Sequence, residues 1–260
     1  MEYGIPSLME FSTVERHAAF CSENGYRFVE LNMTYPWFQA EYLTVDLLQS
    51  VKKTYGIEFT LHLHDQVNPF ELCNDLREAS VRMVIQALEV ASENGIRRIT
   101  MHMMPGMYSA VAGVKKYIYE HCLNDYLEYA KRFRDLVSKY IGKDTILCVE
   151  NTSGYHTYQK QAVELLLESP SFGLTYDVGH DAKIGWKDAE FVMNHSDRIR
   201  HFHIHDRNSG ANHLAFGTGM LDLKKYLDLA DKLQCTVLAE VKESESLIVT
   251  RKYLQDIGKW

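Results

Sequence analysis

Residue types that bind divalent cations are concentrated between residues 172 and 205. Two predicted strands, 173–177 and 199–205, lie in this stretch, and each ends in carboxylate or imidazole side chains. The second strand alternates apolar residues with three histidines: His201, His203 and His205. Because side chains alternate between the two faces of a strand, these imidazoles share one face. Carboxylate and imidazole groups at the ends of adjacent strands are the ligands that a divalent cation site requires.

The composition is that of a chain able to bury a full core. Of its 260 residues, 46% are hydrophobic and 24% are charged, and the net charge is −7 with histidine neutral. This acidity gives no support to broad binding of nucleic acid or of anionic membranes, although a locally basic cleft is compatible with it. No apolar run approaches the roughly 20 residues of a membrane span, and the N-terminus has no signal-peptide pattern. Five widely spaced cysteines without a CxxC pair predict a reduced, cytoplasmic protein.

Strand and helix patterns alternate along the whole chain, and glycines such as Gly56 and Gly95 end predicted helices. Strands are predicted at 3–5, 26–31, 57–64, 99–103, 145–149, 173–177, 199–205 and 236–241. Helices are predicted at 12–24, 43–55, 75–94, 114–140, 161–168, 186–194, 223–233 and 245–257. Near-continuous apolar strands between longer amphipathic helices predict a parallel sheet that is covered by helices.

Eight strand–helix units are the number found in a (β/α)₈ TIM barrel, which is the predicted α/β fold class. An open doubly wound sheet is the alternative. The first predicted strand is not followed by GxGxxG, which removes the simplest dinucleotide site. No linker, low-complexity tract or charge block divides the chain, so we expect one domain over residues 1–260.

Six ligand-type residues stand at or near the carboxyl ends of six predicted strands: His62, His102, Glu150, Asp177, His203 and Glu240. In a (β/α)₈ barrel these ends surround one pocket, where the active sites of such enzymes lie. Burying several carboxylates there is costly unless a cation or a proton compensates their charge. The pattern therefore predicts a metal site. The alternative is that Asp177 caps a helix and that the others are ordinary polar positions.

Seven short motifs occur in the order of a known superfamily. They are LHLH (61–64), HMMPG (102–106), VENTSG (149–154), YDVGH (176–180), HFHIHD (201–206), HLAFGTG (213–219) and AEVK (239–242). On these motifs, which cover most of the chain, the sequence resembles the xylose isomerase-like (β/α)₈ barrel superfamily. That superfamily includes sugar isomerases and epimerases and the endonuclease IV DNA-repair enzymes. The motifs indicate the superfamily and leave the substrate open.

The epimerase-like pattern implies one Mn²⁺, Zn²⁺ or Co²⁺ ion held by four residues: Glu150, Asp177, His203 and Glu240. The resemblance alone selects His203 over His205, since both lie on one strand face. It implies that one glutamate removes a proton next to a carbonyl and that the other returns it, through an enediolate. The expected substrate is a small sugar or sugar-like polyol ketone. His180 and Arg207 are then candidates to bind its oxygens.

The endonuclease IV-like pattern implies three zinc ions and abasic DNA as the substrate. The first ion would be bound by His62, His102 and Glu150, and the second by the four residues of the epimerase-like pattern. The third would need His180 and an aspartate–x–histidine pair, which here reads Ala211-Asn212-His213. Alanine cannot bind a metal, so only two histidines remain for that ion, too few for tight binding.

Asp206 and Asn208 are candidate replacements for the missing aspartate. The departure at Ala211 favours the isomerase or epimerase over the zinc phosphodiesterase, which stays the alternative enzyme. A third hypothesis is a barrel that binds a sugar without converting it.

Several residues beyond the ligand set are candidates for contact with the substrate. Trp37, in an aromatic loop, could stack on a sugar or only cover the barrel rim, and His102 and Lys242 could face the pocket. Glu30 is either a pocket residue or a carboxylate inside the barrel with a partner. The glycine-rich turn 217–219 could bind phosphate or simply connect elements. The tyrosine-rich segment 117–140 could contribute to a homo-oligomer contact.

Overall fold

Eight parallel strands close into a barrel in the computed structural model, which describes residues 1–260. Neighbouring strands pair in the order β1–β10–β9–β8–β7–β4–β3–β2, and β2 pairs with β1. The barrel strands are β1 (Tyr3–Pro6), β2 (Phe28–Asn32), β3 (Glu58–His62), β4 (Arg98–His102), β7 (Ile146–Glu150), β8 (Phe172–Asp177), β9 (Ile199–Ile204) and β10 (Thr236–Ala239). The predicted (β/α)₈ barrel is thus confirmed, and the open sheet is excluded because the barrel has no edge strand.

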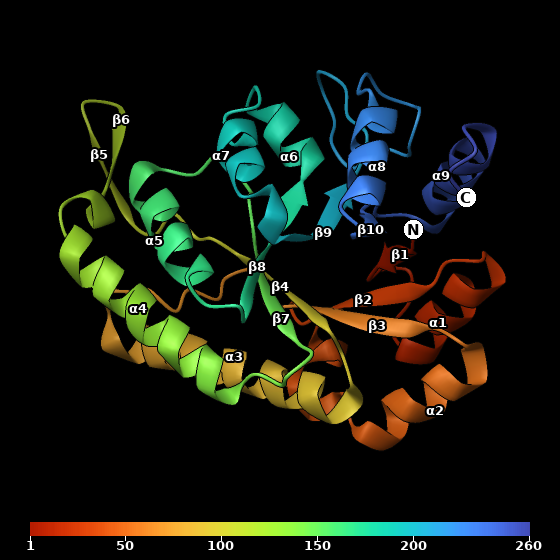
Figure 1. Cartoon of the computed structure of the whole chain (residues 1–260), viewed down its shortest axis with the longest axis horizontal. Helices are drawn as coiled ribbons and strands as arrows, with labels where there is room; N and C mark the ends of the chain where they lie inside the picture. The colour runs from red at the N-terminus through yellow and green to blue at the C-terminus, as the bar shows by residue number, and fades with distance from the viewer.

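Helices surround the barrel (Figure 1). They are α1 (Val14–Glu23), α2 (Val45–Tyr55), α3 (Asn74–Asn94), α4 (Leu123–Tyr140), α5 (Thr157–Leu167), α6 (Val178–Lys183), α7 (Ala189–Asn194), α8 (Leu223–Lys232) and α9 (Ser244–Asp256). In α2 the local sequence determines both ends: the Thr44 side chain accepts from the Leu47 N–H, and Gly56 ends the helix at a φ of 65°. The barrel strands are buried on both faces, which explains their apolar sequences.

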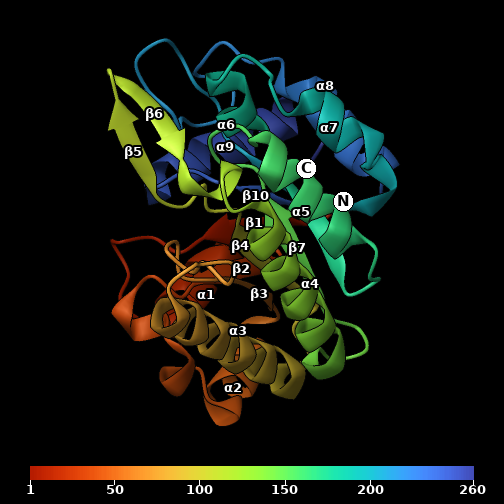
Figure 2. The same cartoon turned by 90° about the vertical axis from the view of Figure 1, so that its left-hand side faces the viewer.

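The segment before α4 differs from the prediction of one helix over 114–140. It forms an antiparallel hairpin of β5 (Tyr108–Val111) and β6 (Val114–Tyr117). The two turn residues, Ala112 and Gly113, both have positive φ angles, of 50° and 79°, as a tight two-residue hairpin turn requires. The hairpin projects away from the barrel (Figures 1 and 2). The predicted helix was wrong here because local hairpin pairing, and not helical spacing, organises these residues.

The segment after β8 also differs from the prediction of one helix over 186–194. Two short helices, α6 and α7, occupy it, and α6 begins directly after the strand. Asp177 Oδ1 accepts from the His180 backbone N–H at 2.7 Å and so caps α6. The helix-cap interpretation of Asp177 is therefore correct, and it accounts for one of the two carboxylate oxygens. The helix before β8 begins at Thr157, four residues earlier than predicted.

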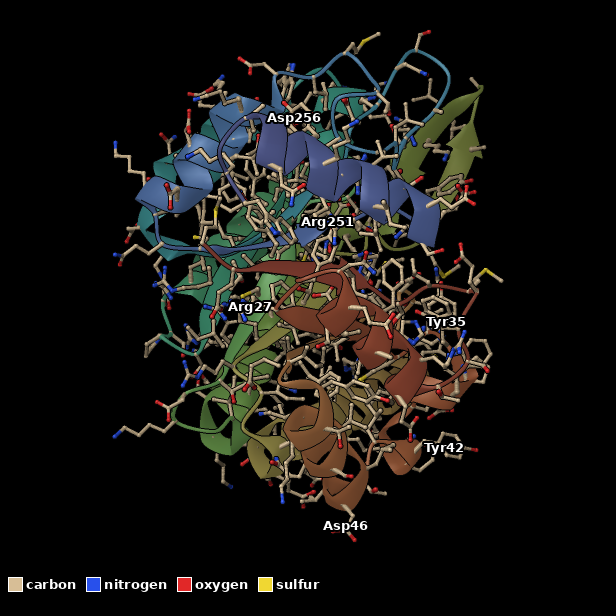
Figure 3. All side chains as sticks on the ribbon, turned by 90° about the vertical axis from the view of Figure 1, so that its right-hand side faces the viewer. Arg27, Tyr35, Tyr42, Asp46, Arg251 and Asp256 are labelled. Carbon is tan, nitrogen blue, oxygen red and sulfur yellow. The ribbon has the colours of Figure 1, made fainter.

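The last helix packs beside the first and closes the ring of helices (Figure 3). Arg251 of α9 donates to the backbone oxygen of Asn24, just after α1, at 3.2 Å. The Tyr26 hydroxyl donates to the Leu247 carbonyl at 2.8 Å. The two chain ends lie close together in both views (Figures 1 and 2). None of the helices combines the length and the apolar character needed to cross a membrane.

Candidate metal centre

Strand register brings the ligand-type residues to one end of the barrel. Parallel pairing of β4 with β7 places His102 opposite Glu150, and pairing of β8 with β9 places Asp177 opposite His203. Glu240 follows β10 directly, and its backbone N–H donates to Ile204 of β9 at 2.8 Å. Residues far apart in the sequence therefore meet because their strands end at the same level.

The four residues of the epimerase-like pattern form one group. Donor atoms of Glu150, Asp177, His203 and Glu240 all lie within 4.8 Å of one another. His203 Nδ1 is 3.0 Å from Glu150 Oε1 and 3.7 Å from Glu240 Oε2. The first three side chains are buried, and the Glu240 side chain is 12% exposed. Three carboxylates and one imidazole therefore converge, and Glu240 is the least buried of the four.

The hydrogen bonds of this group leave two carboxylate oxygens unsatisfied. Asp177 Oδ2 and Glu240 Oε2 are buried without a hydrogen-bond partner. Asp177 Oδ2 lies 3.1 Å from His180 Nδ1, but the contact does not have hydrogen-bonding geometry. Leaving a buried carboxylate oxygen without a partner is costly, and a divalent cation between these groups would remove that cost. The donor set of oxygen and imidazole nitrogen fits Mn²⁺, Zn²⁺ or Co²⁺.

Neighbouring charges keep both glutamates ionised. Burial by itself raises the pKa of Glu150, but His203 and His102 outweigh it and hold that pKa well below the usual range. Burial acts in the same way on Glu240, whose pKa is held well below the usual range mainly by Lys242 and His213. Burial lowers the pKa of His203, yet the Glu150 and Glu30 carboxylates raise it well above its ordinary value. A proton therefore sits on this imidazole at the place where a cation could replace it.

Two more histidines lie against the Glu150 carboxylate. His62 Nε2 is 3.3 Å and His102 Nε2 is 3.4 Å from Glu150 Oε2. The His62 ring nitrogen Nδ1 lies 2.7 Å from the Leu63 carbonyl, so it donates there and turns Nε2 toward the glutamate. Burial lowers the pKa of His62, but Glu150 outweighs it and raises the pKa to about 9. With Asp65, these histidines form a second group of potential ligands.

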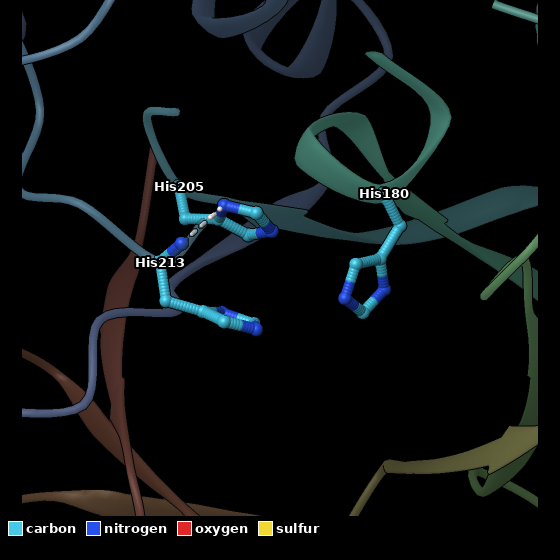
Figure 4. Close-up of side chains that lie close together, drawn as sticks. All are labelled: His180, His205 and His213. Carbon is cyan, nitrogen blue, oxygen red and sulfur yellow. Dashed lines mark hydrogen bonds between the residues drawn. The ribbon is translucent and has the colours of Figure 1, made fainter. Parts of the chain in front are cut away.

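A third group consists of His180, His205 and His213, whose ligand atoms lie within 4.8 Å of one another. The three imidazoles come from the first turn of α6, the position directly after β9 and the loop that follows, and they face a common space (Figure 4). His205 is fully buried, and its Nε2 lies 3.5 Å from Asp177 Oδ1. Gly179 makes room for this ring, because a Cβ atom there would lie 2.0 Å from His205 Cε1. From the sequence, His205 was only an alternative to His203 as a metal ligand. The alternation of histidines along the strand was the signal that could have placed it near the site.

The proposed replacements for the missing aspartate are engaged elsewhere. The buried Asp206 carboxylate accepts backbone N–H groups from four residues: Arg207, Gly217, Gly219 and Leu221. Asn208 Oδ1 accepts from the backbone of Gly210 and of Ala211, each at 2.9 Å. The sequence left open whether either side chain replaces the aspartate, and in the structure both are bound to backbone N–H groups instead. Asp206 accepts the N–H groups of Gly217 and Gly219, and the Ala215 carbonyl accepts that of Thr218, so no N–H group of the 217–219 turn is left to bind phosphate.

The remaining candidates have different surroundings. Lys242 Nζ lies 2.7 Å from Glu240 Oε1 and so faces the centre, while Arg207 Nε donates to Asn212 Oδ1 at 3.2 Å. Trp37 stacks on Tyr35 and lines a surface hollow of about 460 Å³ with Pro36 and Tyr42, which favours the rim interpretation.

Glu30 and Asn151 each contact one of the four candidate metal ligands: Glu30 contacts His203, and Asn151 contacts Asp177. Glu30 is buried inside the barrel against His201 and His203, as expected for a barrel carboxylate with partners. Asn151, which the sequence analysis missed, accepts the Asp177 N–H and donates to the Asp177 carbonyl, both at 2.9 Å. This pair of bonds ties the end of β7 to the end of β8 and so orients Asp177. The feature of the sequence that could have identified Asn151 is its position directly after Glu150 at the end of a predicted strand.

Solved structures share this fold over nearly the whole chain. A D-tagatose 3-epimerase-like protein matches with a TM-score of 0.76 at 20% identity, covering 98% of this chain and 96% of that chain. The 3-keto-D-glucoside 4-epimerase YcjR from E. coli matches with a TM-score of 0.79 at 13% identity over 100% of both chains. The IolI protein with a bound zinc atom matches with a TM-score of 0.73 at 14% identity, covering 99% and 98%.

Sequence comparison points to the same group of proteins. The uncharacterized protein MJ1614 of Methanocaldococcus jannaschii is 27% identical over 205 residues, which are 76% of this chain and 74% of that protein. The sequence pattern of the xylose isomerase-like TIM barrel family matches residues 18–255. Because this match spans most of the chain and the barrel geometry agrees with it, the resemblance seen in the sequence is confirmed. The chain belongs to the xylose isomerase-like TIM barrel family.

Proposed function

We propose that the protein is a divalent-metal-dependent isomerase or epimerase of a small sugar or sugar-like polyol ketone. The observation that carries the proposal is the pair of carboxylates, Glu150 and Glu240, whose oxygens lie 3.0 Å and 3.7 Å from His203 Nδ1. The similarity to a D-tagatose 3-epimerase-like protein and to a 3-keto-D-glucoside 4-epimerase supports the substrate class.

Glu150, Asp177, His203 and Glu240 would hold the ion, and Mn²⁺, Zn²⁺ and Co²⁺ are the candidates. The zinc atom in the IolI structure supports a divalent cation in a barrel of this kind. When bound, the ion supplies Lewis-acid polarisation of carbonyl and hydroxyl oxygens. The two unsatisfied oxygens, on Asp177 and Glu240, are the atoms that most need such a partner.

The two glutamates act as acid and base in this proposal. A pKa below the usual range keeps each of them ionised at neutral pH, which is the form that accepts a proton. One carboxylate removes the proton from the carbon next to the carbonyl. The other, after taking up a proton from solvent, delivers that proton to the opposite face of the enediolate, and the first carboxylate releases its proton to solvent. His180, whose Nδ1 lies 3.1 Å from Asp177 Oδ2, and Arg207, in the loop after β9, are the candidates to orient the hydroxyl oxygens of the sugar.

A second candidate, a zinc phosphodiesterase acting on abasic DNA, is favoured by one observation. His205 joins His180 and His213, so a third ion would have three imidazole ligands in spite of Ala211. Three imidazoles are a sufficient protein ligand set for zinc. The net charge of −7 gives no support to DNA binding.

Metal content per chain distinguishes these proposals. Elemental analysis is made on protein purified without added metal or chelator, and the epimerase proposal expects one manganese, zinc or cobalt ion per chain. A ketose panel in deuterated water should then show solvent deuterium at the carbon next to the carbonyl. Two or more zinc ions with cleavage of an abasic-site oligonucleotide would establish the phosphodiesterase. Sugar binding without deuterium exchange would identify a non-catalytic sugar-binding barrel.

A further inference from the structure

Glu30 is a buried carboxylate in the middle of β2, and its side chain points into the barrel. Glu30 as a whole is only 2% exposed to solvent. Glu30 Oε1 lies 3.2 Å from His203 Nε2, and Oε2 lies 3.5 Å from His201 Nε2. The Thr60 hydroxyl donates to Oε2 at 3.2 Å. Since β2 and β9 are not neighbours in the barrel, the contacts from Glu30 to the histidines cross its interior.

His203 connects this carboxylate to the metal centre through its two ring nitrogens. Nε2 faces Glu30, while Nδ1 lies 3.0 Å from Glu150 Oε1 within the four-residue group. A neutral imidazole carries a proton on one nitrogen and a lone pair on the other. Nδ1 is hydrogen-bonded to Glu150, while the contact of Nε2 with Glu30 lacks hydrogen-bonding geometry. When a cation displaces the proton on Nδ1, the nearby Glu30 carboxylate favours keeping the remaining proton on Nε2, which leaves the lone pair of Nδ1 for the ion.

Glu30 is almost completely buried, and the two imidazoles of His203 and His201 face its carboxylate. The carboxylate is also fixed in place by strand pairing. Glu30 stands opposite Thr60 on β3, and His201 stands opposite Thr236 on β10. The Thr236 hydroxyl lies 2.6 Å from His201 Nδ1, which orients that ring toward Glu30.

We propose that Glu30 is a positioning residue, which fixes the His203 imidazole in the tautomer and rotation that bind a divalent cation through Nδ1. This inference rests on the cation site of the proposed function, and it does not depend on which sugar is converted. It assigns to a residue inside the barrel a role in metal affinity, although that residue does not reach the substrate pocket.

Cation affinity of matched variants tests this role. Glu30→Gln keeps the shape of the side chain and removes its charge, and Thr60→Val removes one hydrogen bond to Glu30 at a distance from His203. Zinc and manganese dissociation constants are measured by competition with a chromophoric chelator, on protein whose fold is checked by circular dichroism. We expect about 10- to 100-fold weaker binding in Glu30→Gln and a smaller change in Thr60→Val. Unchanged affinity in folded Glu30→Gln overturns the proposal.

A second measurement needs no folded variant of Glu30. A long-range ¹H–¹⁵N spectrum of the zinc-loaded protein reports which ring nitrogen of His203 is protonated, with the signal assigned by its loss in His203→Gln. Protonation at Nε2 is expected, and protonation at Nδ1 overturns the proposal. An unaltered protein that binds no divalent cation overturns both this inference and the proposed function. Normal cation binding without any sugar turnover overturns only the proposed function.

Discussion

Lys242 Nζ lies 2.7 Å from Oε1 of Glu240, while Oε2 of the same carboxylate is buried without a hydrogen-bond partner. Burial lowers the pKa of Lys242, but Glu240 outweighs it and raises the pKa above its ordinary value, so the lysine stays charged. The unpaired oxygen lies 3.7 Å from His203 Nδ1. The two oxygens of Glu240 therefore have different surroundings: one is held by a cationic side chain, and the other faces the candidate metal centre.

Replacing this carboxylate tests the two-glutamate mechanism. Glu240→Gln keeps the size of the side chain and removes the group that accepts the proton. We expect turnover of the identified ketose, measured at saturating cation, to fall about 10²- to 10⁴-fold with little change in the melting temperature. Glu190→Gln, on the exposed side of α7, is the matched control and should keep full activity. Retained turnover in the Glu240 variant would rule out this mechanism.

Cation binding should stabilise the folded chain. The buried oxygens of Asp177 and Glu240 gain a partner when an ion binds, whereas the unfolded chain has no preformed site. At a cation concentration about 100 times the dissociation constant, the expected stabilisation is about 2.7 kcal/mol. For a chain of this size that corresponds to a rise of about 5–10 °C in the melting temperature.

Calorimetric scans with manganese or zinc, compared with scans in a chelator, measure this rise. His203→Gln should reduce it, since one of the four ligands is lost. Equal melting temperatures with and without the cation would contradict a metal centre at these residues.

Asp206 organises the loop between β9 and α8. Its carboxylate accepts four backbone N–H groups at distances of 2.8 to 3.1 Å. Asp206→Ala leaves these four partly buried donors without their acceptor, and we expect the free energy of unfolding to fall by about 3 kcal/mol. Urea denaturation measures the change, with the exposed Asp231→Ala as a control that should stay within about 0.5 kcal/mol. A loss below about 1 kcal/mol would mean that water replaces the carboxylate.

The buried Asp188 should make stability depend on pH. Burial raises its pKa above the ordinary value of 3.8, and the nearby Asp181 adds to the rise. Its stabilising contribution is therefore complete below that ordinary value and is lost as the pH rises through the raised pKa of the folded state.

Asp188→Asn removes this titration while keeping an acceptor for the Tyr155 N–H, which Asp188 Oδ1 now accepts at 2.9 Å. Between about pH 3.5 and pH 7, the unfolding free energy of the unaltered protein should decrease relative to that of the variant. Urea denaturation at several pH values follows both proteins. Parallel pH profiles would contradict the assignment of this dependence to Asp188.

The sequence by itself determined the barrel and the place of most ligand-type residues. Apolar strands and amphipathic helices alternate eight times, and local signals such as Thr44 and Gly56 determine where helices begin and end. Strand-end positions such as Glu150 and Asp177 follow from that alternation, because parallel strands in a barrel end on one face. Local pairing around Ala112 and Gly113 was not anticipated, since a four-residue strand has too short a pattern to oppose a long helical one.

Only the tertiary structure decided between residues that share a face or a motif. His203 and His205 are equivalent in the strand pattern, and the register of β8 with β9 places His203 opposite Asp177. Glu30 meets His203 across the barrel interior, and Asp206 meets the 217–219 turn through a loop closure. These contacts join side chains whose separation in sequence carries no periodic signal. They depend on strand register and on the closing of the barrel, which are properties of the whole chain.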